Sequence, residues 1–429
     1  MILTMNSSKG IDLNLKRQEL IALVMIFLSI AVLMWYYRGN LRDASAYLTW
    51  GKSVLQNDNP YELYSSRSGT FGPVVVSFLL LAVPGFLQTV LVQALSFLSV
   101  GLVIQTFFRS QSRVAKLVIY LFSIWLSPFR ENLATNQISI IVIGILCLGI
   151  LIFQKYKGDS KFELLAASFL AVSVDLKPHL VLFFLFYFIV RHQAFRLALF
   201  TLSVLFVTHT TINLAQGQIL ELSWLDQLSS LNDLAKTGNL NDSVSFWPLA
   251  LKIPLDPQLL YVISTLLVIT LFIMLLRIAR KLSGEATGIA LSFLIPSVSL
   301  YFHFYDLAIL AILAVGVMLQ KQRNFLQIAC FSFILLPLEY QSIRNLVLFG
   351  VLSIFFGLYK TNIRKAIPNV IVGCIIGMAF RIASSALSLN ERDTQVFMVS
   401  LSTLMIGSLI FNALKNGSVI SVSRRIKGD

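Results

Sequence analysis

Long apolar runs recur along almost the whole chain and are separated by short polar or basic segments. They are about 15 to 23 residues long, close to the length that an α-helix needs to cross the hydrocarbon core of a bilayer. A helix pairs its own backbone polar groups, which is what a chain surrounded by lipid requires. The pattern therefore predicts an all-α polytopic membrane protein.

The composition excludes a soluble fold. Of the 429 residues, 57% are hydrophobic and 13% are charged, and the mean hydropathy is +0.80. Soluble domains carry about 25% charged residues, and a soluble core cannot bury this much apolar surface. No stretch is left for a soluble domain, so residues 1–429 are interpreted as a single integral membrane domain.

The basic residues mark the sides of the membrane. A formal net charge of +14 is compatible with nucleic-acid binding. However, these residues occur in twos and threes between apolar runs rather than on one continuous face, and the positive-inside rule explains them better. The clusters assigned to the cytoplasm are Arg109/Arg113/Lys116, Lys155/Lys157/Lys161, Arg191/Arg196, Arg277/Arg280/Lys281, Lys321/Arg323, Lys360/Arg364/Lys365 and Arg424/Arg425/Lys427.

The loops that alternate with these clusters are neutral or acidic. The clearest is 215–257, where the acidic residues are Glu221, Asp226, Asp233, Asp242 and Asp256. We therefore expect 38–70 and 215–257 to be outer loops, both termini to be cytoplasmic, and roughly 12 to 14 helices to cross the cell membrane.

Two apolar segments are too short or too broken to span the membrane simply. Residues 74–83 end at Pro84-Gly85, and the alternation of sides requires this piece to be re-entrant or interfacial on the outer side. The segment 163–190 is split at 175–179, which predicts two short helices that meet at an outer turn.

The cysteines and the known catalytic motifs give no further function. Cys147, Cys330 and Cys374 lie within apolar runs without a Cys-x-x-Cys spacing or a nearby histidine, so neither a disulfide framework nor a metal site is expected. No Walker loop, dinucleotide-binding glycine motif, His-Glu-x-x-His or Gly-x-Ser-x-Gly occurs. The apolar run at 20–37 is long enough to remain as a membrane anchor.

Four unusual polar groups fall on the same outer face of this topology. They are Asp43, the pair Asn136-Gln137, and the segments 175–179 and 303–306. The topology comes from charge alone, and chance would scatter such groups between the two faces. We therefore expect a functional site on the outer face.

Asp43 follows the first helix and opens the polar stretch 39–70. A carboxylate there suits a general base that takes a proton from an attacking hydroxyl. The alternative is an ordinary helix-end carboxylate paired with Arg38 or Arg42, because acidic residues near the boundary are tolerated. Further along the same stretch, the residues expected to shape the site are Asn59, Tyr61 and Tyr64.

Lys177 and His179 flank Pro178, where the helix is expected to break. Two cationic side chains beside the free N–H groups of a broken helix suit a phosphate. The alternative is a tight outer hairpin in which Lys177 reaches toward the lipid headgroups and pairs with Asp175.

His303, Tyr305 and Asp306 form a very short polar loop between two strongly apolar runs. Ionisable groups in such a place are functional by default, although Tyr and His also occur in the aromatic belt at the membrane surface. The pairing of His303 with Asp306 favours a functional role.

Asn136, Gln137 and Arg381 complete the set of candidates. The two amides could bind sugar hydroxyls, or they could simply mark the start of a helix running to about 154 with Thr135 as its cap. Arg381 lies inside the apolar stretch 367–388 and should face protein, water or a lipid phosphate, or reach for the outer surface.

Taken in order, these elements resemble the polyprenyl-phosphate-mannose-dependent mannosyltransferases of glycosyltransferase family 87, members of the GT-C superfold. The segments that carry the resemblance are Asp43, Gly51 to Tyr61, Phe71-Gly72-Pro73, Asn136-Gln137, Leu176-Lys177-Pro178-His179 and His303-Phe304-Tyr305-Asp306-Leu307. They are short, and together they cover most of the chain loosely.

The resemblance implies a GT-C-like helical bundle whose active site opens on the outer face. It implies inverting transfer of a hexose, mannose in the family, from a polyprenyl phosphate to a lipid-linked or envelope glycan. It assigns the catalytic base to Asp43 and contacts with the donor phosphate or sugar to Lys177 and His303. No cofactor is required, because the leaving group is already activated and no carboxylate cluster demands a metal.

Two other functions compete with this one. A transporter or lipid flippase would also have broken helices and buried charges, but its site would sit at mid-membrane between repeats, and no repeat is visible. In a non-catalytic scaffold, Asp43 would be dispensable.

Overall fold

The computed structural model describes residues 7–38, 85–217, 257–279 and 304–310, with single positions between and just beyond them. Every regular element in these residues is helical. The elements are α1 (Ser7–Tyr36), α4 (Gly85–Phe107), α5 (Arg113–Trp125), α6 (Ser127–Thr135), α7 (Ser139–Lys155), α8 (Ser160–Leu176), α9 (Pro178–His192), α10 (Phe195–Gln216), α13 (Pro257–Ala279) and the 3-10 turn η2 (Phe304–Leu307).

The apolar runs form helices of membrane-crossing length, as the sequence predicts. Among the helices that the structure describes, three are long and apolar enough to cross a bilayer: Arg17–Tyr36, Leu87–Phe107 and Phe195–Ala215. A fourth is possible if α6 and α7, which meet at 108°, count as one broken span. The chain is therefore an α-helical membrane protein, and the remaining expected spans and both long outer loops lie largely outside the described residues.

Two of the helix breaks fall where polar residues interrupt the apolar runs. Between α6 and α7, Asn136 takes the left-handed conformation with φ 51°, which asparagine tolerates better than most residues. Between α8 and α9, Pro178 occupies the first helical position of α9, where its missing N–H costs nothing. The two short helices expected within 163–190 are confirmed.

One predicted boundary is wrong. The helix that contains Cys147 begins at Ser139 rather than at Asn136, and Thr135 does not cap it. Thr135 is the last residue of α6, and its hydroxyl donates to Glu131 O of the same helix. The left-handed turn at Asn136 belongs to the end of α6, and it delays the start of α7 by three residues.

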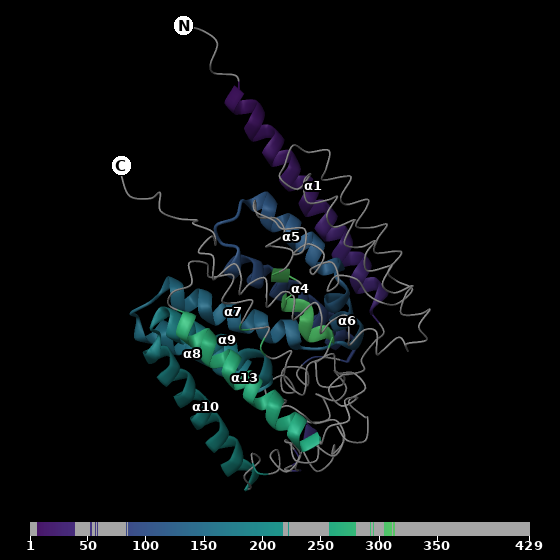
Figure 1. The fold of residues 1–429 in the computed structure, drawn as a ribbon. Helices are drawn as coiled ribbons and strands as arrows, with labels where there is room; N and C mark the ends of the chain where they lie inside the picture. The colour runs from purple at the N-terminus through teal and green to yellow at the C-terminus, as the bar shows by residue number, and fades with distance from the viewer. Residues whose placement is uncertain are drawn as a thin grey trace, which may run out of the picture.

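The core is formed where α7 packs between α4 and α8 (Figure 1). Its side chains are almost all fully buried aliphatic residues, and Cys147 is buried among them. Helix α4 approaches very closely at Gly144, because a Cβ there would lie 2.9 Å from Ser99 Cα. Small residues thus allow two backbones to meet inside the bundle, as in other membrane helix pairs.

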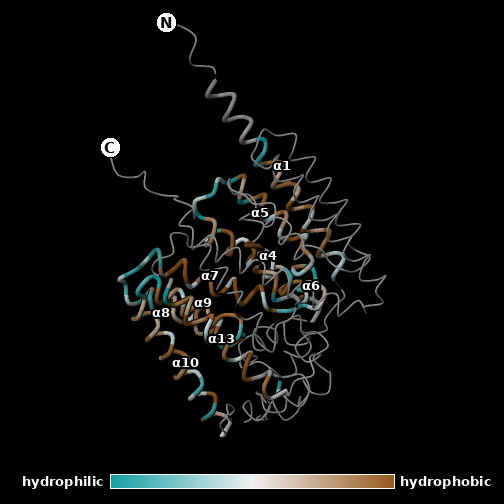
Figure 2. The backbone as a smooth tube through the Cα atoms, in the orientation of Figure 1, coloured by the Kyte–Doolittle hydropathy of each residue, from teal (hydrophilic) through white to brown (hydrophobic). Residues whose placement is uncertain are grey.

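Helices α1 and α10 lie at opposite edges of the described bundle (Figure 1). Only 17% of the α1 span and 11% of the α10 span is buried, against 56% of the α4 span. Their exposed residues are mostly large and apolar, and the tube in Figure 2 is hydrophobic along much of both helices. These two helices present the surface that lipid would cover.

The basic turns gather at one end of the bundle. Helices α4 and α7 run side by side in the same direction, so the turns that follow them, 108–112 and 156–159, lie at the same end. Both turns are hydrophilic in Figure 2. An ion pair of 3.1 Å from Arg196 to Glu163 joins the start of α10 to the start of α8 at that end. Arg191 of α9 donates to Ala279 O at the end of α13.

The two helix breaks lie at the opposite end. Helix α7 has 17 residues, so its first residue, Ser139, lies about 25 Å from its basic end. Helix α1 also ends there, because Gln93 in the first half of α4 donates to Tyr37 O at 3.0 Å. The polar segment that follows α1 thus leaves the bundle at the end where α6, α8 and α9 break.

The close approach of α4 and α7 predicts a specific sensitivity. Replacing Gly144 by alanine forces Cβ against the backbone of Ser99, and such overpacking costs about 1–3 kcal/mol. We expect Gly144→Ala to lower the unfolding temperature of the detergent-solubilised protein. The matched control is Gly101→Ala in α4, where the nearest atom, Tyr120 Cε2, lies 3.7 Å away. Equal unfolding temperatures for the two variants would contradict this packing.

Candidate functional site

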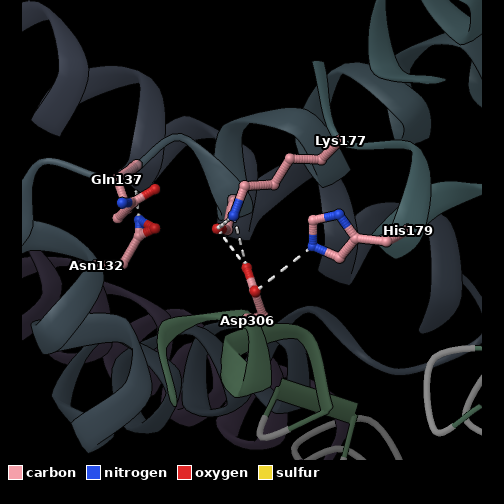
Figure 3. A network of polar contacts seen from close by, with 6 residues as sticks. Asn132, Gln137, Lys177, His179 and Asp306 are labelled. Atoms are coloured by element: carbon pink, nitrogen blue, oxygen red, sulfur yellow. Dashed lines mark hydrogen bonds and ion pairs between the residues drawn. The ribbon is translucent and has the colours of Figure 1, made fainter. Parts of the chain in front are cut away.

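A buried ion pair joins η2 to the break between α8 and α9. Lys177 Nζ lies 2.9 Å from Asp306 Oδ1 and donates to Ser139 Oγ at 2.7 Å (Figure 3). The Ser139 hydroxyl in turn donates to Asp306 Oδ1 at 2.6 Å. Three segments far apart in the sequence therefore meet in one hydrogen-bonded cluster, which we call the Lys177–Ser139–Asp306 network.

This network is closed to solvent. The side chains of Lys177 and Asp306 are 3% and 0% exposed, and Ser139 is buried. Taking two charges out of water is costly unless they are paired and hydrogen-bonded. Each charge here has the other at hydrogen-bonding distance, and Ser139 bridges them, so the cluster is electrically balanced inside an apolar bundle.

His179 is the more exposed member of the site. It lies in the first turn of α9, its Nε2 is 3.8 Å from Asp306 Oδ2, and its side chain is 21% exposed (Figure 3). The distance is too long for a hydrogen bond but suits an ion pair when the imidazole is protonated. His179 therefore faces Asp306 on one side while part of its ring remains accessible.

A tight turn of amide side chains lies beside the network. After α6, Gln137 N donates to Asn132 O at 2.9 Å, and Asn136 N donates to Leu133 O at 3.3 Å. Asn132 Nδ2 then donates to Gln137 O at 2.8 Å, which fixes the turn from inside (Figure 3). Because η2 packs on α6, this turn and Asp306 belong to one site.

The structure brings five of the predicted site residues together. Asn136, Gln137, Lys177, His179 and Asp306 all lie at the helix breaks. Tyr305 is on the same turn as Asp306, in η2, without a described side chain. The other predicted site residues lie outside the described residues: Asp43, Asn59, Tyr61, Tyr64, His303 and Arg381.

The alternative interpretation of Lys177 is wrong. Its ammonium is buried rather than extended toward the lipid headgroups, and it pairs with Asp306 rather than with Asp175. Asp175 instead lies 3.0 Å from His209 Nε2 on α10. Residues 175 and 177 are two positions apart at the end of a helix, so their side chains leave in different directions and find partners on different helices.

Sequence reasoning missed Ser139, Asn132 and His209. Each sits in or beside an apolar run, and a single Ser, Asn or His in such a run carries no motif. The available signal for Ser139 is its spacing, three residues after Asn136 at the start of an apolar helix. The partners of Asn132 and His209 depend on how helices pack, which spacing along the chain does not reveal.

The chemistry of this site suits a polar ligand with an anionic part. An ammonium and an imidazole lie close together at the start of α9, and such groups favour phosphate. Asp306 already neutralises Lys177, so further attraction for an anion comes from the donor groups of His179 and from the positive end of the α9 dipole. Within the described residues, no group of three His, Cys, Asp or Glu side chains is placed to hold a metal ion.

A comparison with protein families decides what kind of protein this is. The sequence profile of glycosyltransferase family 87 matches residues 69–300, more than half of the chain. The chain belongs to glycosyltransferase family 87. No curated protein and no solved structure matches this family 87 chain significantly.

Membership makes the protein a glycosyltransferase, and the matched range contains much of the site. Asn132, Asn136, Ser139, Lys177 and His179 all fall within residues 69–300. Two candidate carboxylates fall outside it: Asp43 precedes it, and Asp306 follows it. The structure nevertheless connects Asp306 to the matched range through Lys177 and Ser139.

The buried ion pair of this family 87 protein predicts strong coupling between its partners. Lys177→Met leaves the Asp306 carboxylate buried without its cation, which costs about 3–5 kcal/mol. The double variant Lys177→Met/Asp306→Leu removes both charges, so we expect it to unfold at a higher temperature than either single variant. Thermal unfolding in detergent measures this. If the decreases in unfolding temperature of the two single variants simply add in the double variant, the two side chains are not coupled.

Proposed function

We propose that this glycosyltransferase moves a hexose, mannose by family resemblance, from a polyprenyl phosphate to a lipid-linked or envelope glycan. The observation that carries the proposal is a buried, balanced cluster of charges at the broken ends of membrane helices, in a member of family 87. A donor whose headgroup lies at the membrane surface and whose tail lies in the bilayer would meet the protein at this depth.

The donor phosphate is the leaving group in this reaction. Its negative charge grows as the bond to the sugar breaks, so groups that stabilise that charge lower the barrier. His179 is the best placed to contact it, since its ring is partly exposed in the first turn of α9, at the positive end of the helix dipole. Lys177 lies behind it, neutralised by Asp306 and hydrogen-bonded to Ser139.

The acceptor hydroxyl needs a base, and we assign this role to Asp43. A carboxylate that removes the hydroxyl proton as it attacks contributes typically about 10²–10⁴-fold. Direct attack from the face opposite the phosphate inverts the anomeric carbon. The end of α1, seven positions before Asp43 in the chain, lies at the same end of the bundle as the broken helices, which supports this assignment.

We place the reaction on the outer face of the cell membrane, in a GT-C-like multi-pass bundle with both termini in the cytoplasm. The basic turns mark one end of the bundle, and the positive-inside rule assigns that end to the cytoplasm. The site lies at the other end, about 25 Å away. No metal or other cofactor is required, because a phosphate-linked sugar is already activated.

The variant Asp43→Asn tests the assignment of the catalytic base. Asp43→Asn keeps the size of the side chain and removes its basicity, so we expect transfer from polyprenyl-phosphate mannose to fall by about 10²-fold or more while the protein still folds. The matched control is Asp58→Asn, an exposed carboxylate further along the same polar stretch, which should retain activity. Radiolabelled sugar transfer by purified protein in lipid nanodiscs measures both.

Two outcomes of this assay would refute the proposal in different ways. Full activity of Asp43→Asn would remove Asp43 as the base while leaving the reaction intact. Absence of transfer by the wild-type protein from any polyprenyl-phosphate hexose, combined with movement of lipid between leaflets of a vesicle, would favour the transporter or flippase instead.

A second prediction tests the contact with the donor phosphate. His179→Gln removes the ring that faces the site, so we expect the KM for the donor to rise several-fold and the KM for the acceptor to stay the same. His192→Gln is the control, because His192 lies in the last turn of the same helix, at the basic end. Equal donor KM values for the two variants would exclude His179 from the donor site.

A further inference from the structure

Two asparagine side chains at the turn after α6 are buried with polar atoms that have no partner. Asn132 and Asn136 are each 0% exposed. Within the part of the chain that the structure describes, neither Nδ2 nor Oδ1 of Asn136 makes a hydrogen bond, and Asn132 Oδ1 makes none either. The site therefore satisfies its charges but leaves three neutral amide atoms unsatisfied.

The backbone explains why an asparagine is tolerated at position 136 but not why its amide is buried. The residue has φ 51° and ends α6 in the left-handed conformation, which glycine adopts more easily still. An amide that served only this turn would gain by pointing to water. Buried polar groups without partners are rare in native proteins, and each calls for a specific reason.

The unsatisfied atoms define the chemistry of the ligand that would fit them. They are one NH₂ donor and two carbonyl acceptors. A phosphate only accepts hydrogen bonds and would be repelled by both oxygens, whereas a cation would leave the NH₂ group unpaired. Hydroxyl groups donate and accept at the same time, so the hydroxyls of a sugar can pair with both kinds of atom. Exchanging O and N of the Asn136 amide does not alter this argument, since both are unpaired.

We propose that Asn132 and Asn136 form the subsite for the sugar ring of the donor, separate from the groups that meet its phosphate. This inference rests on the proposed function, because it assumes a glycosyl phosphate as the donor. The arrangement along the chain suits such a donor: Ser139, three residues after Asn136, lies 2.7 Å from Lys177 Nζ. Amides for a sugar and cations for a phosphate are thus neighbours, as the two parts of a glycosyl phosphate are.

The burial of the amides places a condition on the entry of the sugar. Their atoms have no accessible surface, so the chain that covers them has to shift before a ligand can reach them. Helix α6 packs on η2, which carries Asp306, so the turn with the amides and the ion pair lie on adjoining elements.

The test measures how two substitutions to glycine change the binding of two lipids. Asn136→Gly keeps the left-handed turn and deletes the amide. The control Gln193→Gly makes the same change at the end of α9, where Gln193 is exposed and has φ 52°. Binding of polyprenyl-phosphate mannose and of bare polyprenyl phosphate is measured for both variants in nanodiscs. We expect Asn136→Gly to lower the affinity for the sugar-bearing lipid about tenfold or more and to leave the affinity for the bare lipid unchanged.

The unfolding temperature separates a ligand site from a structural role. If the amide is reserved for a ligand, Asn136→Gly unfolds at the same or a higher temperature than the wild type, because it deletes an unsatisfied buried group. Unchanged affinity for the sugar-bearing lipid overturns the inference, and so does an equal loss of affinity for both lipids together with a lower unfolding temperature. If the wild-type protein binds neither lipid, the proposed function fails, which is a different result from either of these.

Discussion

The contact between Lys177 and Asp306 determines the architecture of the site. The two residues are 129 positions apart, and Ser139, which bridges them, is 167 positions from Asp306. Neither charge would be stable alone at this depth in an apolar bundle, so burial of one requires the other. Their pairing holds η2 against the starts of α7 and α9.

The helix breaks occur at the same place in the bundle as this ion pair. Backbone that leaves the helical conformation at membrane depth is tolerated where protein or a water-filled cavity surrounds it. Both breaks described here meet that condition, because Asn132 and the network at Lys177 supply polar partners around them. The break before α7 also releases N–H groups that a continuous helix would have consumed. At the start of α9, Pro178 has no N–H, and Leu180 N and Val181 N donate to Lys177 O.

How much the sequence predicts depends on the range of the interaction. The helical membrane fold, the break at Pro178 and the grouping of the two amides, Lys177, His179 and Asp306 follow from hydrophobic length, proline chemistry and the placement of charge. These are local or topological signals. The start of α7 at Ser139 was displaced by three residues, because the left-handed turn at Asn136 ends one helix before the next begins.

Partner choice was not predictable in the same way. Asp175 and Lys177 are near neighbours in sequence, and their opposite charges suggested a pair, yet each contacts a residue from another helix. Which helix supplies a partner follows from packing across the bundle, where α8 contacts both α7 and α10. Ser139 and His209 acquire their roles only through this packing, so no motif could have marked them.

The balance of charge has a consequence for turnover in the proposed reaction. The product polyprenyl phosphate has to leave, and a site with several unpaired cations would hold it as tightly as the transition state. Binding that is uniform between ground state and transition state lowers KM without raising kcat. Because Asp306 neutralises Lys177, the net attraction for phosphate depends on the partly exposed His179 and on the N-terminal end of α9. Selection for the donor then falls to neutral groups near the sugar, which recognise the hydroxyls present before transfer and absent from the carrier lipid afterwards.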